Sequence, residues 1–155
     1  MTGGLLVALA ALRGAQVIAT AGPSSRQRVS ALGARHVIDY HDQDWPEHVR
    51  AVTDGHGAAA AASAAPDGAA SAIRAVADGG RLATITSDPP AEQRGITISS
   101  VYVRPDGRQL RDLATPFGDG RLEISVGASY RLADAARALA RVTGGHAGGA
   151  VVLAP

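Results

Sequence analysis

The sequence predicts an α/β fold with a parallel, doubly wound sheet, and three observations support this class. Short runs of apolar and β-branched residues alternate with segments of helical periodicity along the 155 residues. Glycine and proline punctuate the short connections between these segments. The chain contains neither an internal repeat nor a linker. Because strands that alternate with helices at this spacing are typical of a parallel sheet covered on both faces, we expect a single domain over residues 1–155.

The first elements follow from hydrophobic periodicity and capping signals. Residues 3–13 predict a helix, because leucines recur on one face of the segment. The β-branched stretch 16–20 predicts the first strand. A second helix is expected at 25–32, with Ser24 or Ser25 as its N-cap.

The alanine-rich run at 58–65 is the one place where local propensity and position disagree. Before it, residues 35–40 predict a strand, and Asp44 caps a helix with Pro46 in its first turn. Alanine favours a helix, but glycines stop the preceding helix and Pro66 ends the run after a strand's length. We predict a strand at 58–65.

The rest of the chain continues the alternation. Each further strand is a short apolar run, and the helices between them end at glycines. The expected strands lie at 81–86, 96–103 and 149–154, and residues 122–132 are expected to be extended. The expected helices lie at 67–80, 105–120 and 133–145.

Composition excludes several kinds of chemistry. The chain has no cysteine, which removes disulfides and thiolate zinc ligands. All 15 basic residues are arginine, which removes Schiff-base chemistry on lysine. The net charge of +1 gives no general attraction to nucleic acid or anionic membrane, and the opening apolar run is too short to span a bilayer. We expect a cytoplasmic protein that binds neither nucleic acid nor membrane.

A series of segments carries a family resemblance through its order and spacing. The segments are "LRGAQVIAT", "LGARHVIDY", "GGRLATI", "VYVRPDGRQL", "GDGRLEISVGASYRLADAARAL" and "GGHAGGAVVLAP". Together they resemble the nucleotide-binding half of the medium-chain dehydrogenase/reductase superfamily. The most similar branch is the zinc-independent one, which comprises quinone oxidoreductases, zeta-crystallin-like proteins and enoyl reductases.

The resemblance implies a Rossmann-like sheet that lacks its usual first strand and the catalytic domain. In the family a strand and a fingerprint like G-x-G-x-x-G precede the first helix, and Gly3 corresponds to the last part of that fingerprint. Without that strand, 16–20 and 58–65 pair directly or another chain fills the gap. We expect direct pairing, because alanine side chains let the layers close up. A mis-assigned start codon or a cloned fragment is an alternative explanation of the truncated fingerprint.

The resemblance also implies which residues hold a cofactor of the NADP type. The expected cofactor-binding residues are Gly3, Gly4, Ser24, Ser25, Arg26 and Tyr40. Arg26 corresponds to the cation that holds the 2′-phosphate, and a guanidinium can hold a phosphate bidentately. The alternative is a solvated Arg26 and a half-buried Tyr40. Since the family's "D-x-V-G" and "R-G-K" segments are replaced here, we expect NADP binding to be weak or absent.

Polar residues at the ends of the strands are the candidates for catalysis. Asp67, Asp88 and Tyr102 lie where strands end, at the crevice in which open α/β sheets bind ligands, and we expect a small-molecule ligand there. Neither they nor the histidines can be ranked from the sequence. No metal site is expected, because no pair of histidines shows the spacing of ligands on a helix.

Two functions from different classes fit these observations. One is the NADPH-binding half, as a fragment or a split half, of a quinone or enoyl oxidoreductase. The other is a repurposed domain without stand-alone redox activity, with a non-redox role such as a cyclase or isomerase in specialised metabolism, or a structural role. In either case the uncharged, β-rich segment 96–103 predicts a homodimer, because family members pair this strand across a two-fold axis.

Overall fold

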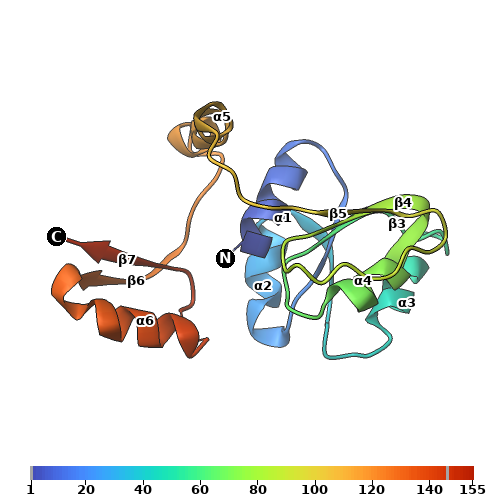
Figure 1. The fold of residues 1–155 in the computed structure, drawn as a ribbon, viewed down its shortest axis with the longest axis horizontal. Helices are drawn as coiled ribbons and strands as arrows, with labels where there is room; N and C mark the ends of the chain where they lie inside the picture. The colour runs from blue at the N-terminus through green and yellow to red at the C-terminus, as the bar shows by residue number, and fades with distance from the viewer. Residues whose placement is uncertain (1, 146) are drawn as a thin grey trace. The chain divides into compact units, whose positions relative to one another are not determined.

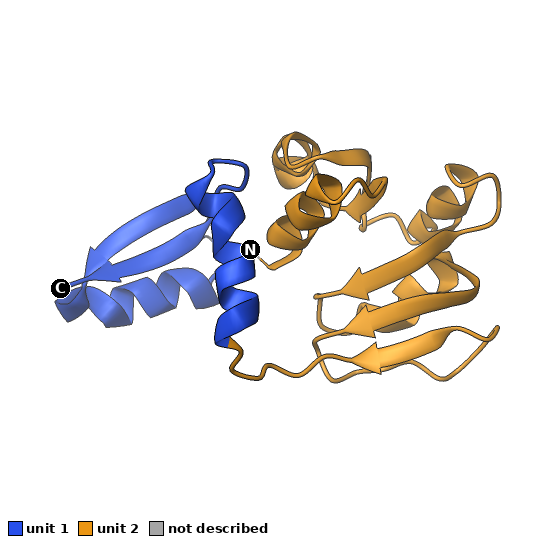
Figure 2. Ribbon diagram, turned by 90° about the horizontal axis from the view of Figure 1, so that it is seen from above, with its two compact units in different colours: residues 1, 107–155 blue, residues 2–106 orange. Residues whose placement is uncertain are grey.

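The computed structural model describes residues 2–145 and 147–155 and divides into two compact units, 2–106 and 107–155 (Figure 2). Each unit has its own helices and strands. The expectation of one domain over the whole chain stays a prediction. Within the described residues, no helix is long and apolar enough to cross a membrane.

The first unit alternates strands and helices from its beginning (Figure 1). Its elements are α1 (Thr2–Leu12), β1 (Val17–Thr20), α2 (Pro23–Ala31), β2 (Ala34–Ile38), α3 (Trp45–Ala51), β3 (Ala58–Ser63), α4 (Ala69–Ala75), β4 (Val76–Thr84) and β5 (Thr97–Ser100). Every paired strand runs parallel to its neighbour. The predicted α/β class with a Rossmann-like arrangement is therefore confirmed.

The strands of this unit form two parallel sheets, β1–β2 and β3–β4–β5. The expected direct pairing of strands 16–20 and 58–65 was wrong, because β1 and β3 belong to different sheets. Each sheet packs its own apolar cluster, so small alanine side chains alone do not draw the two sheets together. The first cluster comprises Val7, Ala19, Ala21, Val29 and Ala34, and the second Ala72, Ile73, Val76, Leu82 and Ile96.

The alanine run is a strand, as predicted. Gly57 immediately precedes β3 with φ +88°, and a Cβ there would lie 2.8 Å from the Ala75 carbonyl oxygen. Only glycine fits this close approach between the start of β3 and the end of α4. The neighbours across the sheet, Ala61 to Leu82 and Ser63 to Thr84, then decide in favour of a strand over helical propensity.

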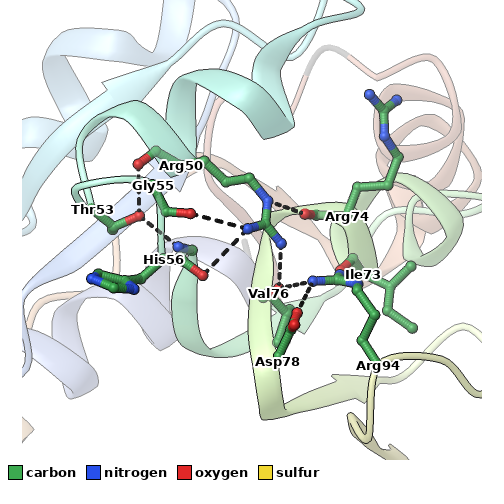
Figure 3. A network of polar contacts seen from close by, with 10 residues as sticks. Arg50, Thr53, Gly55, His56, Ile73, Arg74, Val76, Asp78 and Arg94 are labelled. Atoms are coloured by element: carbon green, nitrogen blue, oxygen red, sulfur yellow. Dashed lines mark hydrogen bonds and ion pairs between the residues drawn. The ribbon is translucent and has the colours of Figure 1, made fainter.

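The helix expected at 67–80 was too long. α4 ends at Ala75 and β4 already begins at Val76, although an irregularity interrupts its pairing with β3. Two arginines stop the helix by binding carbonyl groups at its end (Figure 3). Arg94 donates from Nη1 to the Val76 oxygen at 2.8 Å and from Nη2 to the Ile73 oxygen.

Arg50, on α3, binds the same junction from another side. Its Nε donates to the Arg74 oxygen at 3.0 Å and its Nη2 to the Val76 oxygen at 3.0 Å. Its Nη1 donates to the carbonyl oxygens of Gly55 at 3.2 Å and His56 at 3.4 Å. The two guanidinium groups thus meet at one carbonyl and join α3, α4, β4 and the segment before β5 (Figure 3). We call Arg50 and Arg94 the arginine clamp.

The second unit contains one small parallel sheet. Its elements are α5 (Gly107–Gly118), β6 (Val126–Arg131), the 3₁₀ turn η1 (Leu132–Asp134), α6 (Ala135–Thr143) and β7 (Ala150–Ala154), with β6 paired to β7. Several bounds differ from the prediction: α5 begins at Gly107 and contains Pro116, and the extended stretch expected from 122 is a strand only from Val126. Gly127 and Gly149 let the strands cross closely, since a Cβ on Gly127 would lie 1.9 Å from the Ala147 oxygen.

Removal of the Arg50 side chain tests the clamp. Arg50→Ala removes its hydrogen bonds to the nearby carbonyl groups and leaves the Val76 oxygen with Arg94 alone, and we expect the free energy of unfolding to fall by about 2–3 kcal/mol. Arg50→Lys keeps the charge but not the planar fork, so we expect most of the same loss. Urea denaturation measures both. The control is Arg13→Ala, at the exposed end of α1, for which we expect a change within about 0.5 kcal/mol; equal losses in all three variants would contradict the role of the clamp.

Candidate functional site

The first group of polar residues surrounds Gly22, the residue before α2. A Cβ on Gly22 would lie 3.0 Å from Cε1 of His41 and 3.5 Å from Oη of Tyr40. The rings of Tyr40 and His41 have centroids 4.2 Å apart and are tilted by 31°. The end of β2 and the start of α2 therefore meet at a glycine, with Tyr40, half exposed, beside it.

Arg26 is attached to the end of β2 by its own side chain. Its Nη1 donates to the Val37 oxygen at 2.6 Å, which leaves the remaining guanidinium donors available on an exposed residue. Ser24 or Ser25 was expected to cap this helix, but α2 begins at Pro23 and Gly22 is its N-cap, with no hydrogen bond from a side chain. Proline at the first helical position is pre-organised for the helix. The helix therefore starts nearer the N-terminus than the expected residue 25.

Asp39 places a negative charge in this group. Its Oδ1 accepts hydrogen bonds from the backbone N–H of His41 at 3.0 Å and from Nδ1 of His41 at 2.7 Å. These bonds to His41, the backbone one first, lower the pKa of Asp39, and the charge of Arg26 lowers it further. Because the carboxylate is ionised near Arg26, it weakens the attraction of this group for a phosphate.

Gly3 and Gly4 both lie in the first turn of α1, but their surroundings differ. A Cβ on Gly3 would meet nothing within 4 Å, whereas one on Gly4 would lie 3.2 Å from Cδ1 of Leu32 and 3.6 Å from Nη1 of Arg28. Arg28 also donates from Nη2 to Oγ of Ser25 at 3.4 Å. This arginine, which sequence reasoning missed, therefore lies between the two sets of expected cofactor residues. In the sequence, the signal that could have pointed to Arg28 was its position two residues after Arg26.

A second group of polar residues lies where β3 and β4 end. Thr84, the last residue of β4, is completely buried, and its Oγ1 lies 3.0 Å from Oδ1 of Asp88 and 2.8 Å from Oγ1 of Thr86. Oγ1 of Thr86 also donates to Oδ1 of Asp88. Ser63, the last residue of β3, is buried beside Thr84 in the sheet. We call Thr84, Thr86 and Asp88 the hydroxyl–carboxylate cluster.

The cluster keeps Asp88 ionised. The hydrogen bond from Thr86 is the largest cause that lowers the pKa of Asp88; burial opposes it, and Thr84 and the backbone N–H groups of Asp88 and Asp67 add to the lowering. Oδ2 of Asp88 is buried and has no hydrogen-bond partner among the described residues. The carboxylate thus draws together the loops after β3 and β4, in which Asp67 and Ser87 adopt left-handed backbone conformations.

The three expected catalytic residues occupy different environments. Asp67 is exposed, and its backbone lies near the Asp88 carboxylate. Tyr102 is 72% exposed and follows β5. The structure therefore brings Asp67 and Asp88 together through a backbone group. Sequence reasoning missed Thr84, although the alternation of Thr84, Thr86 and Asp88 in an extended segment was a signal that they share a side.

Comparison with known proteins gives a consistent result. Residues 32–153 match the family model described as zinc-binding dehydrogenase. An NAD-dependent alcohol dehydrogenase is 30% identical (TM-score 0.82; 96% of this chain and 46% of that one), and a mycobacterial quinone oxidoreductase is 26% identical (TM-score 0.78; 99% and 53%). The enoyl reductase CurK, at 18% identity, shares the fold (TM-score 0.80; 96% and 50%). No curated protein sequence matches significantly. The chain spans about half the length of these solved structures.

The described residues offer no site for the zinc ion that the family's description names. The chain has no cysteine, and the described residues contain no group of three or more histidine, cysteine, aspartate or glutamate side chains that could hold a metal ion. His41 is paired with Asp39, and Nδ1 of His48 lies 3.6 Å from Oδ2 of Asp42. His146 lies outside the described residues.

The acid sensitivity of the fold tests the cluster around Asp88. Because folding lowers the pKa of Asp88, its carboxylate stabilises the fold above the ordinary carboxyl pKa, and this contribution is lost as the pH falls through the lowered value. We expect Asp88→Asn to lower the melting temperature at pH 7, and the difference from the parent protein to shrink between about pH 5 and pH 3.

Thermal unfolding followed by circular dichroism at a series of pH values measures this difference. The matched control is Asp54→Asn, on the exposed turn after α3, where asparagine also tolerates the left-handed backbone. A difference between Asp88→Asn and the parent that stays constant with pH would show that the carboxylate charge does not stabilise the cluster.

Proposed function

The chain belongs to the zinc-binding dehydrogenase family, and from this membership we propose that it is a nucleotide-binding half with weak affinity for an NADP-type dinucleotide and no hydride transfer of its own. When bound, such a cofactor supplies a hydride. The residues proposed to hold it are those expected from the sequence: Gly3, Gly4, Ser24, Ser25, Arg26 and Tyr40. We also propose a cytoplasmic location, as expected from the sequence.

The observation that carries the proposal is the group around Gly22. Tyr40 offers a ring and a hydroxyl beside the start of α2, and Arg26 offers guanidinium donors from the same end of the sheet. These groups suit the phosphate-bearing adenosine end of a dinucleotide. Asp39 opposes a phosphate through its charge, which is one reason to expect weak binding.

Fewer groups of this chain support binding of the dinucleotide's pyrophosphate. Gly3 leaves open space at the first turn of α1, and Arg28 adds a cation near Gly4. N–H groups at a helix N-terminus favour anions, so α1 offers a partial pyrophosphate site. The resemblance to the reductases implies that their substrate site lies between two domains, and the chain spans about half the length of such structures. We therefore propose that residues 1–155, taken on their own, bind the dinucleotide without reducing a substrate.

A second candidate function rests on the hydroxyl–carboxylate cluster. Asp67 is an exposed carboxyl group on a left-handed backbone, near Asp88, which is held ionised at the ends of β3 and β4. A non-redox reaction in this crevice, such as a cyclisation or isomerisation, needs a base of this kind beside a small-molecule substrate. In that role Asp67 is the proposed base and Asp88 positions its loop. Tyr102, exposed after β5, remains a candidate for substrate contact.

We also propose a homodimer through 96–103, in which β5 is the pairing strand. β5 pairs with β4 on one side and is an edge strand among the described residues. Val101, Tyr102 and Val103 are at least half exposed beyond its end. An uncharged, exposed edge of this kind favours pairing with another strand.

Calorimetric titration with NADPH tests the cofactor proposal. We expect a dissociation constant in the millimolar range, since loss of several charge-assisted contacts, each about 1.5–3 kcal/mol, separates it from a micromolar site. Arg26→Ala should weaken binding further, because the 2′-phosphate loses its cation. We expect no oxidation of NADPH in the presence of a quinone or an enone.

The control is Arg13→Ala, at the opposite end of α1 from Gly3 and Gly4, which should bind NADPH like the parent. Micromolar binding that Arg26→Ala abolishes, together with NADPH oxidation, would overturn the proposal and identify a working reductase.

Proline at position 100 tests the dimer. The N–H of Val101 donates to the Thr84 oxygen at 2.8 Å, and alternation along a parallel strand therefore turns the N–H of Ser100 towards the open edge. Ser100→Pro should remove a donor between subunits and leave the β4–β5 ladder intact. Light scattering should show a dimer for the parent and a monomer for the variant. A monomeric parent would refute the dimer.

A further inference from the structure

A carboxylate and an imidazole ring form a pair in the turn after β2. Oδ1 of Asp39 accepts hydrogen bonds from Nδ1 of His41 at 2.7 Å and from the backbone N–H of the same residue at 3.0 Å. The Asp39 side chain is 32% exposed and the His41 side chain is 62% exposed. The two hydrogen bonds therefore fix the pair in one arrangement, while the ring of His41 exchanges protons with solvent.

The pair lies against residues of the group around Gly22. The ring of His41 lies beside the ring of Tyr40, with centroids 4.2 Å apart, and its Cε1 approaches Gly22. From α2, the charge of Arg26 acts on Asp39, because it contributes to the lowered pKa of that carboxyl group. One cation, one carboxylate and one titratable ring thus share the place at which the adenosine end of a dinucleotide is proposed to bind.

The net charge of these three side chains depends on His41. A guanidinium is protonated at every ordinary pH, and the lowered pKa of Asp39 keeps its carboxylate ionised at neutral and mildly acidic pH. With a neutral His41 ring, the charges of Arg26 and Asp39 cancel. With an imidazolium, the three side chains carry one net positive charge. Because histidine ordinarily changes its charge between about pH 5 and pH 8, its protonation sets the net charge of this group.

Most other charged groups of the surrounding elements lie in contacts of their own. Neither α1 nor β1 contains a charged residue. In the turn after β2 and on α3, Nδ1 of His48 lies 3.6 Å from Oδ2 of Asp42, and Glu47 pairs with Arg74 at 3.5 Å. The remaining charged side chains are Arg28, which bonds to Ser25, Arg50, which binds the α4–β4 junction, Asp44 in the turn, and Arg35 and His36 at the start of β2. Arg26 is thus the charged group of another element that acts on the pair.

Carboxylates and arginines suit different nucleotides. In dinucleotide sites a carboxylate accepts a hydrogen bond from a free ribose 2′-hydroxyl, whereas an arginine accommodates a 2′-phosphate. This chain has one of each, and His41 is bonded to the carboxylate. We propose that Asp39 and His41 determine nucleotide specificity: with a neutral ring, Asp39 favours a free 2′-hydroxyl, and protonation of His41 shifts the preference towards a 2′-phosphate. The inference rests on the proposed function and adds to it the residues that select the nucleotide.

Screening limits the size of this effect. His41 is exposed, so water and salt weaken its interaction with a bound phosphate. At this screening, one added positive charge near a phosphate strengthens binding by about three- to tenfold. A phosphate monoester also takes up a proton near pH 6, at about the ordinary value for its second ionisation, which opposes the effect at low pH. A comparison of variants at the same pH removes this contribution, because the ligand is the same in each titration.

Titration of the full chain with two nucleotides, followed by NMR, tests the proposal. The probes are adenosine 2′,5′-bisphosphate and adenosine 5′-monophosphate, which differ only in the 2′-phosphate, and the measured quantity is the ratio of their dissociation constants. At about pH 5.5 we expect His41→Gln to lower the preference for the bisphosphate about three- to tenfold relative to the parent, and at about pH 8 to leave it unchanged. Asp39→Asn should raise the preference for the bisphosphate at about pH 8 by a similar factor, because the charge of Arg26 is then no longer cancelled.

His48→Gln is the matched control, because His48 also lies beside a carboxylate, that of Asp42, but outside the group around Gly22. This variant should keep the preference of the parent at both pH values, and the melting temperature of each variant shows that it is folded.

The outcomes separate this inference from the proposed function. If both nucleotides bind, and His41→Gln matches the parent at about pH 5.5 or Asp39→Asn matches it at about pH 8, the specificity inference is wrong while the proposed site stands. If neither nucleotide shifts the resonances of Gly22 and Tyr40, in the parent or in Asp39→Asn, the proposed site is wrong and this inference with it.

Discussion

The junction between α4 and β4 depends on two arginines that bind one carbonyl group. Arg50 and Arg94 both donate to the Val76 oxygen, and each also binds carbonyls nearby. A guanidinium can satisfy several acceptors in a plane, which makes arginine suited to end a helix where a strand must begin at once. The position of this boundary sets where β4 starts. The register of β4 against β3 then places Thr84, the last residue of β4, beside Ser63.

The two polar groups depend on different parts of the first unit. The residues around Gly22 are positioned by α2 and the end of β2, which share the first apolar cluster. The hydroxyl–carboxylate cluster is positioned by β3 and β4, which pack on the second cluster and are held by the arginine clamp. A change in one core therefore affects one group of polar residues more directly than the other.

Sequence patterns predicted most elements because glycine and proline bounded them. The strand at 58–65 was correct since its flanking residues limited its length, although alanine favours a helix. The end of α4 was not predictable, because Arg94 lies far along the chain and nothing local marks it as a helix stop. Separate pairing of β1 and β3 was also missed, since strand pairing depends on packing in two distinct cores. The candidate residues were located by resemblance, but the charge of Asp39 beside Arg26 required the structure.

The two polar groups lie on different sheets, because β1 and β3 are not paired. A ligand that spans both polar groups needs the two sheets at a constant separation, and hydrogen-bonded strands provide that because their spacing is about 4.7–4.9 Å. The two sheets of the first unit instead pack on separate apolar clusters, so the Gly22 group and the hydroxyl–carboxylate cluster rely on separate cores. Affinity for an extended ligand then depends on order between the sheets as well as on the side chains that touch it.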